Sequence, residues 1–333
     1  MVELAPAGEG LLRQGFAGDT FNTAWYARRL LPPGWTVSYG TVIGEDAVSE
    51  DMARFIAGEG LSTDALARHP DRTVGLYMIS LKDGERSFSY WRGQSAAKTL
   101  ADDPARLADM LKGRDNIHFS GITLAILPPE DRTKLLEAVS EARRGGATVA
   151  FDPNLRPRLW DGPETMRRAV MDAAAVSDII LPSHEDEAHA FGDATPVATA
   201  SRYGDAGASV VIVKNGPGEI VSLVAGDISR HDPVRVDSVV DTTAAGDSFN
   251  AGFLAAYLER GELAVLPMRE GAVAYAQLYL VFAVTDPDKS VYERVSTFLV
   301  PHDAPGFSIG KTEDKMGQRL VWNSTIRFLS ASK

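Results

Sequence analysis

The residues best suited to chemistry lie in one segment, Asp241–Phe253, whose sequence is DTTAAGDSFNAGF. An alternating apolar run, Val234–Val240, precedes this segment and a helical pattern continues to Leu258, so the sequence predicts a strand, a tight turn of small residues and a helix. The first N–H groups of a helix have no intrahelical partner and carry partial positive charge. The turn at Ala244–Gly246 is therefore expected to hold an anion such as a phosphate.

Asp247 follows this turn and falls in the first turn of the expected helix. A carboxylate beside a phosphoryl group is suited to act as a general base, because it can take the proton of the hydroxyl group that attacks the phosphorus. In the alternative interpretation Asp247 is structural, and its charge only complements the helix dipole.

Short β-rich runs and amphipathic helical stretches alternate from Thr36 to Ala264, a pattern typical of a mostly parallel sheet with crossover helices. The expected strands are Val37–Val42, Asn116–Phe119, Thr148–Phe151, Ile179–Leu181 and Val210–Val213. The expected helices are Glu45–Ala57, Pro129–Arg144, Glu164–Val176, Glu185–Phe191 and Thr195–Ala206. The predicted fold class is α/β.

One stretch breaks this alternation, because two β-rich runs, Arg72–Tyr77 and Arg86–Trp91, flank an Asp-Gly pair at residues 83–84. Asp-Gly between such runs is a strong hairpin signal. An antiparallel hairpin within a parallel sheet suggests a lid over a ligand, and an ordinary edge hairpin is the alternative.

The segment around Asp247 resembles the C-terminal signature of the ribokinase-like (PfkB) carbohydrate kinases, Asp-Thr-x-Gly-Ala-Gly-Asp-x-Phe, with Ala244 in place of a glycine. The resemblance implies a three-layer α/β fold and Asp247 as the general base. It implies that Ala244, Ala245 and Gly246 form the anion hole for the transferred phosphate. It also implies ATP and Mg²⁺ as cofactors, with a monovalent cation as a further candidate.

A segment near the N-terminus resembles the family's Gly-Gly-x-x-x-Asn sugar site. Gly18, Asp19 and Asn22 fall on its positions, and Ala17 replaces the first glycine. The resemblance implies that Asp19 and Asn22 contact sugar hydroxyl groups, and capping of the following helix is the alternative.

Tyr90 and Arg92 lie two residues apart and so share one face of the second hairpin strand. Arg156 ends Asp152–Arg156, which resembles the family's Asp-x-Asn-x-Arg segment, with Asn154 organising the loop. A guanidinium group pairs bidentately with a carboxylate, so two arginines at one site predict a sugar acid as the substrate. The alternatives are a solvated arginine on an edge strand and another in a turn.

The nucleotide and the metal are expected at two later turns. Ser183 and Asp186 take the positions of the family's Asn-x-x-Glu element, which implies that Asp186 holds Mg²⁺ through water, and a helix-dipole effect is the alternative. Lys214, Gly216 and Gly218 resemble the family's nucleotide-phosphate turn, in which Lys214 would neutralise phosphate charge. A plain β-turn is the alternative there.

Taken together, these motifs are most similar to those of the 2-keto-3-deoxygluconate kinases, and the similarity extends over residues 1–277. It implies ATP-dependent phosphorylation of 2-keto-3-deoxygluconate to its 6-phosphate. The alternatives are another ribokinase-like kinase, acting on ribose or fructose, and an inactive sugar-acid-binding protein. Pairing of subunits through the lid, and hence a homo-oligomer, is an expectation from the resemblance alone.

Both ends depart from the family pattern. In the family a first strand with a Gly-Glu element normally precedes the position of Val2, so a central strand is expected to be missing from the kinase domain, residues 1–277, whose lid is expected at residues 72–93. Residues 278–329 resemble a fragment of the acyl-CoA dehydrogenase middle domain, which predicts a β-rich segment over 278–333. A flavin-associated binding module is therefore a competing hypothesis, although the catalytic Glu and the helical remainder of those enzymes are lacking.

Composition limits the remaining classes of function. The chain of 333 residues has 34 Lys and Arg against 45 Asp and Glu, a net charge of −11, and no cysteine. This balance disfavours nucleic acids and anionic membranes as partners, and the lack of cysteine excludes disulfides and thiolate metal sites. No membrane-spanning run or signal-peptide pattern is present, which predicts a cytoplasmic protein. The family resemblance implies a sugar acid and ATP as its small-molecule partners.

Overall fold

The computed structural model describes residues 1–8, 10–82, 85–233 and 244–259, together with four strands between residues 278 and 322. The chain divides into two compact units. The first comprises Met1–Pro233 and Thr242–Leu263, and the second comprises Val234–Asp241 and Ala264–Lys333. All predicted site residues belong to the first unit.

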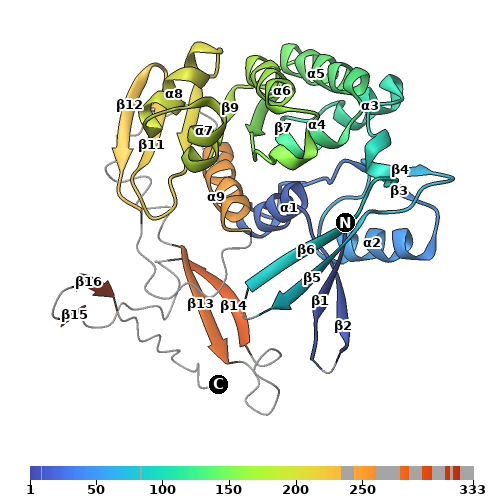
Figure 1. Ribbon diagram of the computed structural model, residues 1–333, viewed down its shortest axis with the longest axis horizontal. Helices are drawn as coiled ribbons and strands as arrows, with labels where there is room; N and C mark the ends of the chain where they lie inside the picture. The colour runs from blue at the N-terminus through green and yellow to red at the C-terminus, as the bar shows by residue number, and fades with distance from the viewer. Residues whose placement is uncertain are drawn as a thin grey trace. The chain divides into compact units, whose positions relative to one another are not determined.

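The first unit is built on a six-stranded sheet in the order β12-β11-β10-β9-β8-β7 (Figure 1). Its strands are β7 (Asn116–Ser120), β8 (Thr148–Asp152), β9 (Ile179–Ile180), β10 (Val210–Val213), β11 (Ile220–Val224) and β12 (Asp227–His231). Strands β7 to β10 run parallel, and β11 and β12 form an antiparallel edge. The predicted α/β class with a mostly parallel sheet is confirmed, and β10 has the bounds expected from the sequence.

Helices in the described part of the chain connect the strands of the first unit and pack against them. They are α1 (Asp19–Leu30), α2 (Ala47–Gly58), α3 (Pro104–Leu111), α4 (Gly121–Ile126), α5 (Pro129–Arg144), α6 (Pro163–Ala175), α7 (His184–Phe191), α8 (Pro196–Asp205) and α9 (Ala245–Glu259). Side-chain caps set the N-termini of several helices. Asp46, Asp103 and Thr195 accept hydrogen bonds from the first free N–H groups of α2, α3 and α8.

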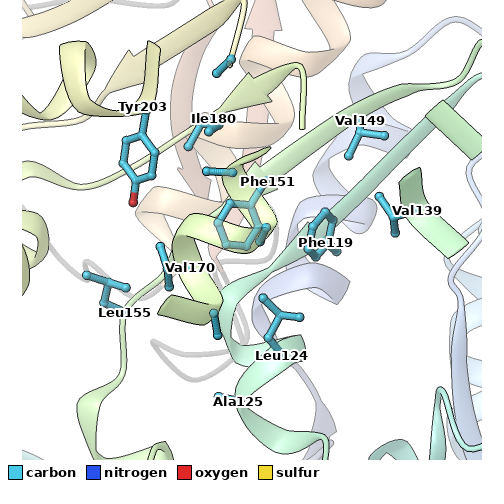
Figure 2. Close-up of a cluster of buried hydrophobic side chains, with 14 of the residues drawn as sticks. Phe119, Leu124, Ala125, Val139, Val149, Phe151, Leu155, Val170, Ile180 and Tyr203 are labelled. Carbon is cyan, nitrogen blue, oxygen red and sulfur yellow. The ribbon is translucent and has the colours of Figure 1, made fainter. Parts of the chain in front are cut away.

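Alternate residues of the central strands enter two different apolar cores. Val149 and Phe151 of β8 pack with side chains of α4, α5, α6 and α8, as Figure 2 shows in part. Ala150, between them, packs on the opposite face with Leu254 of α9. Because successive side chains of a strand point to opposite faces, an uninterrupted apolar strand fills both cores. The sheet therefore carries helices on both faces and has three layers.

A separate four-stranded sheet, in the order β2-β1-β5-β6, contains the predicted hairpin (Figure 1). Its strands are β1 (Val2–Pro6), β2 (Leu12–Phe16), β5 (Leu76–Lys82) and β6 (Glu85–Trp91). Strands β5 and β6 pair antiparallel, as the hairpin prediction requires, and the Asp-Gly pair at 83–84 lies outside the described residues. The hairpin is thus half of a larger sheet rather than an insertion in the parallel one.

Two expected strands are displaced by several residues. The strand predicted over Arg72–Tyr77 begins only at Leu76, because its start is set by pairing with β1, where Leu76 lies opposite Val2. The strand predicted over Val37–Val42 is β3 (Thr41–Gly44), which pairs in parallel with β4 (Leu66–His69). The bounds of β5 and β3 are therefore set by pairing with strands that lie elsewhere in the sequence.

A cavity of about 630 Å³ lies beside β7, which ends the six-stranded sheet. It is lined largely by apolar side chains, among them Ile117 and Phe119 of β7, Leu135 of α5 and Leu254 of α9. Strand β1 belongs to the four-stranded sheet. The expectation that the family's first strand is missing from the kinase domain stays a prediction.

The second unit contains strands, consistent with the β-rich tail expected from the sequence. The described strands are β13 (Leu278–Val284), β14 (Val295–Pro301), β15 (Thr312–Lys315) and β16 (Gln318–Trp322). β13 pairs antiparallel with β14, and β15 with β16. Within the described ranges of the whole chain, every helix is too short or too polar to cross a membrane.

A buried charge cluster joins α7 to α8. The fully buried carboxylate of Glu187 accepts hydrogen bonds from Arg202 (2.7 Å) and from the hydroxyl group of Tyr203 (3.0 Å). Arg202 also donates to Asp193 at 2.6 Å. Burial raises the pKa of Glu187 to about 7, and the arginine offsets the cost of its charge.

We expect Arg202→Met to lower the free energy of unfolding by about 3–5 kcal/mol at alkaline pH, because Glu187 is left buried and ionised without its partner. Arg230→Met is the matched control. Arg230 pairs with Glu219 at the surface, and its loss should cost only about 0–1 kcal/mol. Urea unfolding measures both values, and equal effects would contradict this account of the cluster.

Candidate active site

One pocket of about 460 Å³ gathers most of the residues predicted from the sequence. The predicted residues that line it are Gly18, Asp19, Asn22, Tyr90, Arg92, Arg156, Ser183, Asp186, Lys214, Ala244, Ala245, Gly246 and Asp247. Gly216 and Gly218 lie in the turn after β10, outside this lining. Their contact with a nucleotide stays a prediction.

Asp247 lies in the first turn of α9, where the sequence placed it. Its Oδ2 accepts a hydrogen bond from Asn22 Nδ2 of α1 at 2.8 Å, and Thr23 donates to its backbone oxygen at 3.3 Å. Burial raises the pKa of Asp247 to about 7, and the nearby carboxylates of Asp19 and Asp152 act in the same direction. A carboxylate with this pKa is suited to proton transfer near neutral pH.

The turn before Asp247 has the backbone that the signature requires. Ala244 has φ of 60°, in the left-handed region that glycine adopts most easily, which explains why a glycine is usual at this position. The alanine methyl group costs about 1–2 kcal/mol there. Ala244 O accepts from Ser248 N at 2.8 Å, so the N–H groups of Ala245, Gly246 and Asp247 precede the first intrahelical bond and are available to an anion.

Asp19 lines the pocket, and its side chain does not cap α1. Its Oδ2 accepts hydrogen bonds from Ser120 Oγ at 2.6 Å and from Asn154 Nδ2 at 2.9 Å, whereas α1 begins after Gly18 without a side-chain cap. The helix-capping alternative is therefore wrong for Asp19. Gly121 permits this arrangement, because a Cβ atom there would lie 1.9 Å from the carbonyl oxygen of Pro153.

Arg92 presents a guanidinium group to the pocket beside the ring of Tyr90, 4.3 Å from the ring centroid. Among the residues that the structure describes, no carboxylate lies within ion-pair distance of Arg92. Burial lowers its pKa, and the resulting cost of the charge favours an anionic ligand.

Arg156 has a different environment from Arg92. Its Nη1 donates to the carbonyl oxygen of Leu155 at 2.7 Å and lies 3.6 Å from Asp186 Oδ2. Burial raises the pKa of Asp186, and Arg156 opposes that shift. The structure therefore brings the predicted sugar-acid residue and the predicted metal residue into contact, which the sequence did not indicate.

Lys214 extends from the end of β10 toward the start of α9. Its Nζ donates to Asn250 Oδ1 at 2.8 Å and lies 3.6 Å from Asp152 Oδ1. A Cβ atom on Gly246 would lie 3.8 Å from this Nζ, so the ammonium group stands next to the expected anion hole. A cation in this position can contact a phosphate held by α9.

Several residues of the site were missed by sequence reasoning. Tyr77 lines the pocket and its hydroxyl group donates to Glu3, and Ser120 and Asn250 hold Asp19 and Lys214. The only available signal was spacing, because Asn250 lies three residues after Asp247 and hence on the same helix face. Tyr77 lay in a strand whose bounds were predicted wrongly.

Comparison with known sequences places this site in a family. The family model described as pfkB family carbohydrate kinase matches residues 9–277. The chain belongs to the pfkB family of carbohydrate kinases. The matched span of this pfkB chain includes every residue of the pocket named above, and the resemblance of residues 278–329 to acyl-CoA dehydrogenases lies beyond it and stays a prediction.

Curated relatives and a solved structure agree with this family. The 2-dehydro-3-deoxygluconokinase of Escherichia coli is 38% identical over 268 residues, which are 78% of this pfkB chain and 86% of the relative. That of Haemophilus influenzae is 36% identical over 82% of this chain and 89% of its own length. The crystal structure of a PfkB protein from a Polaromonas species superposes with a TM-score of 0.70 at 26% identity, covering 83% and 92% of the two chains. The ribokinase-like fold expected from the sequence is thus confirmed.

Proposed function

We propose that this pfkB kinase transfers the γ-phosphoryl group of ATP to the 6-hydroxyl group of 2-dehydro-3-deoxygluconate, also called 2-keto-3-deoxygluconate. The observation that carries the proposal is the occurrence in one pocket of Asp247, at the start of α9, and of Arg92, whose guanidinium group has no carboxylate partner among the residues that the structure describes. The names of the curated relatives support the same substrate.

The geometry supports a defined division of labour. The sugar acid would lie between the four-stranded sheet and α1, with its carboxylate on Arg92 and Arg156 and its hydroxyl groups near Asp19 and Asn22. Lys214 and the first N–H groups of α9 would hold the phosphate oxygens.

The reaction balances with one proton transfer. Asp247 accepts the proton of the attacking 6-hydroxyl group, while the oxygen of that hydroxyl group forms a bond to the γ-phosphorus. The bond from that phosphorus to the β–γ bridging oxygen breaks, and ADP leaves with the electron pair. The sheet over the sugar limits access of water, which would otherwise compete as the acceptor.

The residues of the pocket fit a magnesium ion. Asp152 and Asp186 both line it, and no group of three His, Asp or Glu side chains in the described ranges forms a complete metal site. Mg²⁺ typically takes one or two carboxylates, keeps several waters and completes its shell with substrate phosphates, which matches this donor set. When bound, the ion would neutralise phosphate charge, with Asp186 acting through water.

We expect kcat/KM for the sugar acid to rise with pH through an apparent pKa near 7, because only the ionised form of Asp247 accepts a proton. The raised pKa makes the protonated, inactive carboxyl group predominate below that pH, so kcat/KM should fall by about tenfold per pH unit. Steady-state assays from about pH 5 to pH 9 at saturating ATP measure the profile. A midpoint near the ordinary aspartate value of about 4 would contradict this role.

The position of phosphorylation tests the proposal directly. Phosphorus NMR of the product formed from 2-dehydro-3-deoxygluconate and ATP should show a single new phosphomonoester, coupled to the protons of the terminal carbon. A phosphoester on a secondary hydroxyl group would mean that the sugar lies in the pocket in another orientation. Phosphorylation of ribose or fructose alone would favour the alternative of a kinase that acts on a neutral sugar.

A further inference from the structure

The side-chain amide of Asn250 bridges the partly buried ammonium group of Lys214 and the buried carboxylate of Asp152. Asn250 lies on α9 and is 0% exposed. Its Oδ1 accepts from Lys214 Nζ at 2.8 Å, and its Nδ2 donates to Asp152 Oδ2 at 2.7 Å. Lys214 Nζ and Asp152 Oδ1 form an ion pair at 3.6 Å, which is beyond hydrogen-bond distance.

The charges on either side fix the orientation of this amide. An ammonium group only donates hydrogen bonds and an ionised carboxylate only accepts them, so the amide oxygen must face Lys214 and the amide nitrogen must face Asp152. Asp152 is otherwise occupied by the backbone N–H of Asn154, which donates to its Oδ1 at 3.2 Å. Lys214 and Asp152 form an ion pair at 3.6 Å with the amide bridging them, and without the amide they could close to a direct hydrogen bond and neutralise each other more fully.

The backbone of Lys214 is fixed independently of Asn250. Its N–H donates to Pro182 O and its carbonyl oxygen accepts from His184 N, both at 2.8 Å. Only the direction of the side chain is therefore open to change. With Asn250 in place, that side chain ends next to Gly246, beside the free N–H groups of α9.

We propose that Asn250 is a positioning residue that holds the ammonium group of Lys214 out of hydrogen-bond distance of Asp152 and directs it at the phosphate held by the start of α9. This inference rests on the proposed function, since it assigns Lys214 to the phosphate of ATP. It also explains why α9 carries an amide three residues after its general base, where an apolar residue would serve packing alone.

A double-mutant cycle between Asn250→Ala and Lys214→Met tests the inference. Asn250→Ala should raise KM for ATP by roughly 10- to 100-fold, because a charge-assisted contact is lost, and should leave KM for the sugar acid within about twofold. In the Lys214→Met background, Asn250→Ala should raise KM for ATP by less than about a further threefold, because the ammonium group that Asn250 positions is gone. If the amide were only structural, Asn250→Ala would raise KM for ATP and KM for the sugar acid alike, in the wild-type and the Lys214→Met backgrounds. That result would overturn the proposal.

Two further measurements keep the result interpretable. Leu254→Ala truncates a buried side chain of the same helix, and it should lower stability in urea without a change beyond about twofold in KM for ATP. Calorimetric binding of a nonhydrolysable ATP analogue repeats the cycle without turnover. If the wild-type protein phosphorylated no sugar acid, the proposed function would fail. Equal losses of analogue binding in Asn250→Ala, Lys214→Met and the double variant would still support the role of Asn250. Losses of analogue binding that add up in the double variant would refute it.

Discussion

Replacement of Asp247 by asparagine is expected to lower kcat by about 10²–10⁴-fold, the range attributed to a general base, while KM for ATP changes little. The asparagine keeps the volume of the side chain and its place at the start of α9, so the anion-binding N–H groups stay where they are. What is lost is the group that accepts the proton of the attacking hydroxyl.

Release of ADP, measured in steady state, gives the size of this effect. Asp227→Asn is the matched control, since Asp227 is an exposed carboxylate on β12 outside the pocket. The pH dependence of any residual rate should also disappear, because the titrating carboxylate is gone. A variant within about threefold of the wild-type rate would show that another group, or water, takes the proton.

The second large effect is expected at Arg92. Arg92→Met should raise KM for the sugar acid by roughly 10- to 100-fold, because one charge-assisted pair with the substrate carboxylate is lost. Arg156→Met should have a smaller effect, since Arg156 already lies 3.6 Å from Asp186 and gives up that contact when it binds the substrate. Neutral sugars should be used no worse by either variant.

Matched variants separate charge from geometry at this position. Arg92→Lys keeps the charge but loses the planar fork, so it should recover only part of the affinity. Arg158→Met, two residues from Arg156 and outside the pocket, should leave KM for the sugar acid within about twofold. If Arg92→Met and Arg158→Met behaved alike, the guanidinium group would not bind the substrate.

Local signals in the sequence were sufficient for much of the fold. Pro129–Arg144 begins with proline and ends with two arginines, and the helix has these bounds in the structure. Val210–Val213 is an uninterrupted β-branched run and forms a buried parallel strand. The signature around Asp247 placed a carboxylate in the first turn of α9, where the structure has it.

Features that depend on distant contacts could not be predicted. The hydrogen bond from Asn22 to Asp247 joins residues 225 positions apart, and the amide of Asn250 faces Lys214 only because α9 packs beside β10. The start of β5 is likewise set by pairing with β1. Propensity and periodicity carry no information on such pairs, which arise only when the sheet brings several loops to one edge.

Phosphorylation of a sugar acid in this pocket is tested most directly by ADP release from ATP with 2-dehydro-3-deoxygluconate compared with gluconate, ribose and fructose. We expect turnover that is restricted to the keto-deoxy acid and abolished by Asp247→Asn. Equal turnover with fructose or ribose would contradict the assignment of Arg92 and Arg156 to a substrate carboxylate.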